Sequence, residues 1–130
     1  MAKSLRPAPL SEAQLEIMNV IWDSGEATVA DVWKALSARR RLARNTVQTM
    51  LTRLEEKGWL RHREEGQAFL YRAMFPREAT RKHLVRQLVD TAFSGSAEGL
   101  VMALLEGRGL SKDEADRIRA MINQAEKEKP

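Results

Sequence analysis

The sequence predicts a mainly α-helical protein in which three helices and a β-hairpin are followed by three further helices. Apolar residues recur at helical spacing in six segments, most of them separated by glycine, proline or serine turn signals. A single stretch, residues 59–72, has β-favouring runs on both sides of a short glycine-containing link. A chain of 130 residues fits one domain, or one compact domain with a smaller appendage.

Composition and charge exclude several classes of protein. The absence of cysteine excludes disulfides, thiolate metal sites and cysteine nucleophiles. No apolar run approaches the roughly 20 residues that span a bilayer, and the N-terminus has no signal-peptide core. We therefore expect a cytoplasmic protein with no membrane partner. The net charge is +4, but residues 34–72 carry +6 and the remainder −2, so positive charge is concentrated in one segment.

The first two helices are predicted from their start signals. Ser11 and Gln14 form a capping box before a helix that is apolar on two sides and is therefore structural. Residues 24–27 read as a turn. Thr28, with Asp31 three residues later, caps the second helix.

The third helix, residues 43–58, has a buried stripe and an unusual outer face. Val47, Met50, Leu51 and Leu54 fall on the stripe. The opposite face carries short amides and hydroxyls, side chains that hydrogen-bond to base edges, and an arginine, the commonest reader of guanine. The alternative is a surface helix in which Asn45 and Gln48 form a capping box.

Basic residues flank this helix on both sides. Residues 39–41 are three consecutive arginines in a connector, either solvated or placed for phosphate contacts. Residues 59–64 and 68–72 form the predicted hairpin. Three helices followed by a basic hairpin make a winged helix-turn-helix. The hairpin arginines suit backbone contacts, or else protect a solvated strand edge.

The last part, residues 76–130, contains helices at 77–93, around 100–105 and after Ser111, where Glu114 completes a capping box. About 50 residues seldom bury enough apolar surface to be stable alone. We expect a homodimer; the alternative is a monomer in which these helices fold back on the winged helix. The predicted organisation is a flexible arm (1–9), a winged helix (10–75) and a dimerisation domain (76–130). The expected dimer residues are Leu84, Leu88, Phe93, Leu100, Val101, Leu104, Leu105, Ile118 and Ile122.

Signs of catalysis, of metal binding and of a cofactor are absent from the sequence. His62 and His83 have no acidic or cysteine partner at ligand spacing, so each reads as a surface or interface histidine. The glycines match no nucleotide-binding pattern. We therefore predict no catalytic residues, no metal and no cofactor.

Residues 10–14, 20–22, 45–58 and 69–71 are the four stretches in which this chain resembles a known family, the penicillinase and methicillin-resistance (BlaI/MecI) repressors. The similarity spans about residues 10–125. The resemblance implies winged-helix repressors that dimerise through a C-terminal helical domain and bind inverted-repeat operators. It implies operator contacts by Thr46, Gln48, Thr49 and Arg53, with Arg61 and Arg63 on the wing.

The resemblance also raises the question of inactivation. In antibiotic-responsive members, a membrane sensor-protease triggers cleavage at an Asn-Phe bond in the fifth helix. Here Ala103 and Leu104 occupy those positions, so the cleavage pair is absent. A copper-responsive branch carries paired cysteines, which this chain lacks.

Two functions are compatible with these observations. The first is a dimeric repressor whose partner is a double-stranded DNA operator, with contacts from the third helix, the connector and the wing: Arg44, Asn45, Thr46, Gln48, Thr49, Thr52, Arg53, Arg40, Arg41, Arg61 and Arg63. The second is a winged-helix protein-interaction module. A protein-binding face more often exposes an apolar patch, whereas this one is polar and basic, which favours DNA.

Overall fold

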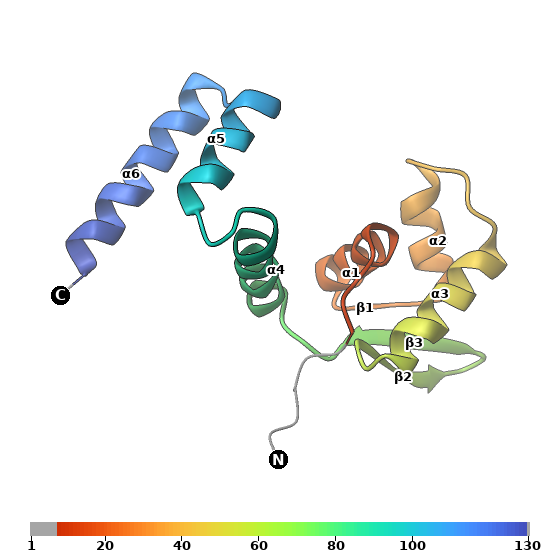
Figure 1. Ribbon diagram of the computed structural model, residues 1–130. Coiled ribbons are helices and arrows are strands. Elements are labelled where there is room, and N and C mark those ends of the chain that lie inside the picture. Colours follow the sequence, from red (N-terminus) through yellow and green to blue (C-terminus); the bar gives the residue numbers. More distant parts are fainter. Residues whose placement is uncertain (1–7, 130) are drawn as a thin grey trace, which may run out of the picture. The chain divides into compact units, whose positions relative to one another are not determined.

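The computed structural model describes residues 8–129, which form two compact units that divide between Lys82 and His83 (Figure 1). The division falls inside a helix, seven residues after the boundary expected at residue 76. The predicted arm at residues 1–9 lies outside the described residues except for Ala8 and Pro9.

The first unit contains three helices and a three-stranded antiparallel sheet, and the first turns of a fourth helix. In order these are α1 (Glu12–Ser24), β1 (Glu26–Ala27), α2 (Val29–Ser37), α3 (Arg44–Glu56), β2 (Leu60–Glu65), β3 (Ala68–Ala73) and α4 (Arg77–Ala92). The strand order is β1-β3-β2, with β3 central. This is the winged helix-turn-helix that the sequence predicts (Figure 1).

Local start signals place α1 and α2 as predicted. Ser11 Oγ accepts from the amide of Gln14 at 3.1 Å, and the Gln14 side chain accepts from the Ser11 amide at 2.9 Å. Thr28 and Asp31 make the same reciprocal pair at 3.1 and 3.0 Å. Both capping boxes are confirmed.

Two local predictions are wrong. Residues 24–27 are not only a turn, because Glu26 and Ala27 form β1 and pair with Arg72 and Tyr71 of β3. A strand of two residues is too short to show a periodic pattern in the sequence, and it forms because it pairs with β3. The alternative capping box at Asn45 is also wrong, since α3 starts at Arg44 after Ala43, with no side-chain cap.

A single apolar core holds the first unit together. It takes residues from α1, α2, α3, all three strands and the link before β2: Ile17, Met18, Ile21, Ala27, Val32, Leu36, Val47, Leu51, Leu54, Trp59, Leu60 and Tyr71. Three indole N–H groups donate across this unit: Trp22 to Phe75 O (2.9 Å), Trp33 to Leu42 O (2.7 Å) and Trp59 to Ala8 O (2.8 Å). The Trp33 bond anchors the connector that leads into α3, so the core and this bond together fix the helix's orientation.

The second unit contains the rest of α4, α5 (Ala97–Gly107) and α6 (Lys112–Glu128). Ser94 and Gly95, at φ 51° and 86°, follow the end of α4. No residue of α5 or α6 is buried, including the apolar run at residues 100–105. The capping box at Ser111 is half formed. Its hydroxyl accepts from the Glu114 amide at 3.1 Å, while the Glu114 carboxylate lies 3.4 Å from Arg108.

No single helix of the described chain is long and apolar enough to cross a bilayer. Together α4 and α5 reach that length and composition, but they are bent by 95° at their junction.

Candidate nucleic-acid interface

Helix α3 presents opposite faces to the core and to solvent. Val47, Leu51 and Leu54 are fully buried, so the helix cannot rotate without breaking the core. Seven residues predicted to contact DNA project from its exposed side: Arg44, Asn45, Thr46, Gln48, Thr49, Thr52 and Arg53. Five of these seven line one shallow groove together with Glu56: Asn45, Gln48, Thr49, Thr52 and Arg53.

The polar groups on this face are mostly unengaged. Within residues 8–129, Thr52 is the one residue of the seven whose side chain has a hydrogen-bond partner. Its hydroxyl donates to the backbone oxygen of Gln48 at 3.0 Å and also forms a hydrogen bond with Tyr71. Glu56, which sequence reasoning did not select, lies one turn after Thr52 and Arg53. Its helical spacing from Thr52 and Arg53 in the sequence would have been enough to predict it on this face. A carboxylate can accept a hydrogen bond from the cytosine amino group.

A second recess, here called the wing cleft, has a volume of about 320 Å³ and lies between α2, α3 and the hairpin. Thr28, Val29 and Ala30 at the start of α2 form one wall, and Arg44 and Gln48 of α3 form another. The hairpin contributes Gln67, Ala68, Phe69 and Tyr71. A helix N-terminus and an arginine beside the recognition face suit an anion such as a backbone phosphate.

The connector arginines differ in their surroundings. Arg40 Nη2 lies 2.9 Å from Glu16 Oε2 on α1, so part of its charge is neutralised in the free protein. Arg39 and Arg41 make no ion pair within the part of the chain that the structure describes, and both are exposed. Arg41 is therefore the more available of the two connector residues predicted to contact DNA.

The two faces of the hairpin carry different residues. Strand pairing places His62 opposite Tyr71 and Glu64 opposite Phe69 on the face that also holds the buried Leu60. The alternate residues, including Arg61, Arg63 and Arg72, lie on the outer face. Both predicted wing contacts, Arg61 and Arg63, are therefore on the face that points away from the core.

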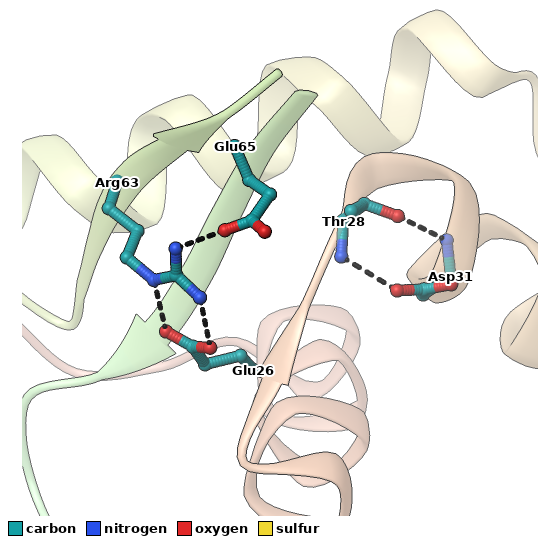
Figure 2. Close-up of polar contacts among 5 residues, drawn as sticks. All are labelled: Glu26, Thr28, Asp31, Arg63 and Glu65. Atoms are coloured by element: carbon teal, nitrogen blue, oxygen red, sulfur yellow. Dashed lines mark hydrogen bonds and ion pairs between the residues drawn. The ribbon is translucent and has the colours of Figure 1, made fainter. Parts of the chain in front are cut away.

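Arg63 is held by two carboxylates (Figure 2). Its Nε and Nη2 each lie 3.0 Å from a carboxylate oxygen of Glu26, and its Nη1 contacts Glu65. The Arg63 guanidinium lowers the pKa of the Glu26 carboxyl, and the carboxylates raise the pKa of Arg63. Arg61, on the same strand face, has no such partner among the described residues.

His62 joins the wing to the recognition helix. Its Nδ1 lies 2.7 Å from Glu55 Oε1, and its ring stacks on Phe69 with centroids 4.0 Å apart. Glu55 is seven residues from His62 in the sequence, and the fold brings the two side chains together. Burial raises the pKa of the neighbouring Tyr71, and the charge of Glu55 adds to this, while a hydrogen bond with Thr52 opposes it.

Within the described residues, no group of three or more histidine, aspartate and glutamate side chains is arranged to hold a metal ion. His62 with Glu55 supplies at most two ligands.

The second unit places its nine predicted dimer residues at partly or fully exposed positions. Leu84, Phe93, Leu100 and Ile118 are half-buried, whereas Leu88, Val101, Leu105 and Ile122 are 45–55% exposed and Leu104 is 37% exposed. Three further apolar residues on the same helices, Val85, Met102 and Met121, are 52–65% exposed. Their helical spacing in the sequence would have been enough to include them among the predicted dimer residues.

The first unit defines a winged helix-turn-helix protein, the class built around a DNA-recognition helix. The chain matches the family model described as penicillinase repressor over residues 10–124. It therefore belongs to this family, the BlaI/MecI repressors.

Relatives and a solved structure support the assignment. The transcriptional regulator BlaI of Mycobacterium tuberculosis (strain CDC 1551 / Oshkosh) is 34% identical over 128 residues, which cover 97% of this chain and 89% of the relative. The penicillinase repressor of Bacillus licheniformis is 30% identical over 115 residues, covering 88% and 90%. The solution structure of monomeric B. licheniformis BlaI in complex with the blaP half-operator is similar, with a TM-score of 0.50 and 37% identity. This similarity covers 56% of the present chain and 89% of that one.

Proposed function

We propose that this protein is a dimeric, sequence-specific transcriptional repressor that binds an inverted-repeat operator. The observation that carries the proposal is the outer face of α3, where exposed amides, hydroxyls and an arginine lie beside the wing cleft that Arg44 lines. The relative BlaI, bound to its half-operator, supports DNA as the ligand. Binding to chromosomal DNA places the protein in the cytoplasm.

The proposed contacts divide by chemistry. Asn45, Gln48 and Arg53 read base edges in the major groove, since amides suit adenine and arginine suits guanine. Thr46, Thr49 and Thr52 lie between them and contact bases or the thymine methyl. Phosphates are bound by Arg44 with the start of α2, by Arg41 and Arg40 of the connector, and by Arg61 of the wing.

Dimerisation is proposed from the apolar faces of the second unit. With no buried residue in α5 or α6, these helices lack a core of their own. A second copy of the chain would cover exposed residues such as Leu88, Leu105 and Ile122. A two-fold axis would also present two recognition helices to two half-sites.

Inactivation by the sensor-protease route has little support here. Ala103 and Leu104 lie inside α5 at the positions where the resemblance places a cleavable Asn-Phe pair. We therefore propose that release from DNA uses another signal, and that a response to β-lactams is not implied by family membership.

A salt-dependent titration tests the proposed function. The full chain is titrated onto an inverted-repeat duplex taken from the DNA upstream of its gene, and onto a scrambled duplex of equal length. Tight binding to the native duplex alone, with two chains per site, is expected. No binding to either duplex would overturn the proposal and favour a protein-interaction module. Equal binding to both duplexes that weakens steeply with salt would show that the protein binds DNA without sequence specificity.

A further inference from the structure

We propose that Arg63 is a positioning residue that clamps the wing to β1, and that it does not contact operator phosphates. The inference rests on the proposed DNA-binding function and assigns Arg63 a role different from that of Arg61. Both arginines lie on the outer face of β2, where the sequence predicts DNA contacts for each.

The ion pair of Arg63 has a directional geometry. All three nitrogens of the guanidinium are engaged: Nε and Nη2 with Glu26, each at 3.0 Å, and Nη1 with Glu65 (Figure 2). An arginine fork that meets a carboxylate in two parallel bonds is specific in direction. A single exposed ion pair contributes little, but a bidentate pair with a third charge is a network.

The pair also bridges the two outer strands of the sheet. Glu26 pairs with Arg72 of the central strand β3, whereas Arg63 lies on β2, on the other side of β3. The side chains therefore reach across β3 and join β1 to β2. Because β1 pairs with β3 through two residues only, the ion pair adds a side-chain connection between β1 and the hairpin.

Strand β1 leads directly into a wall of the wing cleft. Glu26 is two residues before Thr28, whose capping box with Asp31 starts α2 (Figure 2). The start of α2 forms one wall of the wing cleft, and the hairpin residue Phe69 belongs to another. The clamp therefore fixes the distance between two walls of the proposed phosphate-binding surface.

Electrostatics favours the existing pair over a bound phosphate. The Arg63 guanidinium lowers the pKa of the Glu26 carboxyl, so both partners stay charged at neutral pH. A phosphate that bound Arg63 would have to displace two carboxylates that are already in place. Arg61 needs no such exchange, because it is exposed and makes no ion pair within the described chain.

The proposal makes an unusual prediction for Glu26→Gln. Removing a negative charge from a DNA-binding protein should tighten binding through charge alone. If Glu26 holds the wing in place, the substitution should instead weaken binding to the operator duplex by roughly threefold to fivefold. Glu64→Gln is the matched control, because Glu64 is the residue next to Arg63 on β2 and has no partner in the described chain. This variant should bind as tightly as the wild type or more tightly.

Substitutions of the arginines separate clamping from phosphate contact. Arg63→Met should weaken binding while leaving the salt slope unchanged, whereas Arg61→Met should lower the slope by about one. Arg63→Lys should behave like Arg63→Met, since lysine cannot make the bidentate pair, although it would serve a phosphate. The exchange Glu26→Arg with Arg63→Glu should recover affinity to within about twofold of the wild type.

The experiment combines these titrations with amide hydrogen exchange of the free full chain. Faster exchange in peptides spanning β1 and β3 is expected for Glu26→Gln and Arg63→Met, but not for Glu64→Gln. If the wild type does not bind the operator duplex more tightly than a scrambled one, the proposed function is wrong. The hydrogen-exchange rates alone then show whether Arg63 clamps the wing to β1. Unchanged exchange in both variants would overturn the clamp. So would a salt slope lowered by about one in Arg63→Met together with tighter binding by Glu26→Gln.

Discussion

Arg53 is the residue of α3 best suited to discriminate between bases. It is exposed, has no partner in the described chain and lies in the groove with Asn45 and Thr49. Arg53→Ala should weaken binding to the operator duplex by roughly 5- to 150-fold, the range of one base contact. The loss on a scrambled duplex should be much smaller. Fluorescence-anisotropy titrations on both duplexes measure the difference.

Arg41→Ala is the matched control for Arg53→Ala. Arg41 is an exposed connector arginine without an ion pair in residues 8–129, unlike Arg40, which Glu16 holds at 2.9 Å. A phosphate contact at Arg41 predicts similar losses on both duplexes and a salt slope lower by about one. Equal losses on both duplexes from Arg53→Ala would contradict its assignment as a base reader.

Glu26 gives a prediction for pH. Its pKa is lower in the folded protein than its ordinary value because Arg63 stabilises the carboxylate. A depressed folded pKa contributes stability above the unfolded pKa, and that contribution is lost as pH falls through the folded pKa. The wild type should therefore be more stable than Glu26→Gln at about pH 6. The difference should shrink below about pH 4.5, near the ordinary glutamate pKa.

Urea unfolding of the two proteins at several pH values measures this difference. The effect is small because the pair is exposed and screened by salt, so it should shrink further at high ionic strength. A difference that stayed constant from about pH 6 to about pH 3 would show that the Glu26 charge is not its origin.

The hairpin turn shows a backbone requirement at the scale of an element. Gly66 has φ +62°, and a Cβ added there would meet no atom within 4 Å. The cost of Gly66→Ala is therefore conformational, roughly 1 kcal/mol, because alanine disfavours positive φ. Gly66→Asn should cost less, since asparagine tolerates this region better. Thermal unfolding of both variants compares them, and equal destabilisation would contradict a backbone origin.

Elements defined by local signals were predictable, and those defined by tertiary partners were not. The capping boxes at Ser11 and Thr28 involve residues three apart, so the sequence contains the whole interaction. Strand β1 depends on β3, more than 40 residues later, and no local pattern marks it. The outer face of α3 follows from local helical spacing and was therefore predicted. The carboxylates around Arg63 and the contact of Glu55 with His62 depend on the tertiary fold and were not predicted.

Apolar surface is distributed unevenly over the whole molecule. All twelve residues of the buried core belong to the first unit, while α5 and α6 bury none. The first unit can thus hold its recognition helix in place without help. The second unit has apolar side chains on every helix and no core of its own, which favours assembly with another copy.

Ile122→Glu tests that assembly. Ile122 is 55% exposed on α6, and a charge buried there in a dimer interface would be strongly unfavourable. The variant should sediment as a monomer at concentrations where the wild type is a dimer. Its affinity for a full inverted repeat should fall by on the order of tenfold or more, while its affinity for a single half-site should be nearly unchanged.

Ala120→Glu is the control for Ile122→Glu, because it adds the same charge to the same helix. Ala120 is exposed, and its position two residues before Ile122 places it about 200° around the helix. It should leave both the dimer and the operator affinity intact. If the Ile122→Glu protein is still a dimer, the interface must lie on another face of the second unit. A monomeric wild type with full operator affinity would exclude the dimer, and the two half-sites would then have to be bound independently.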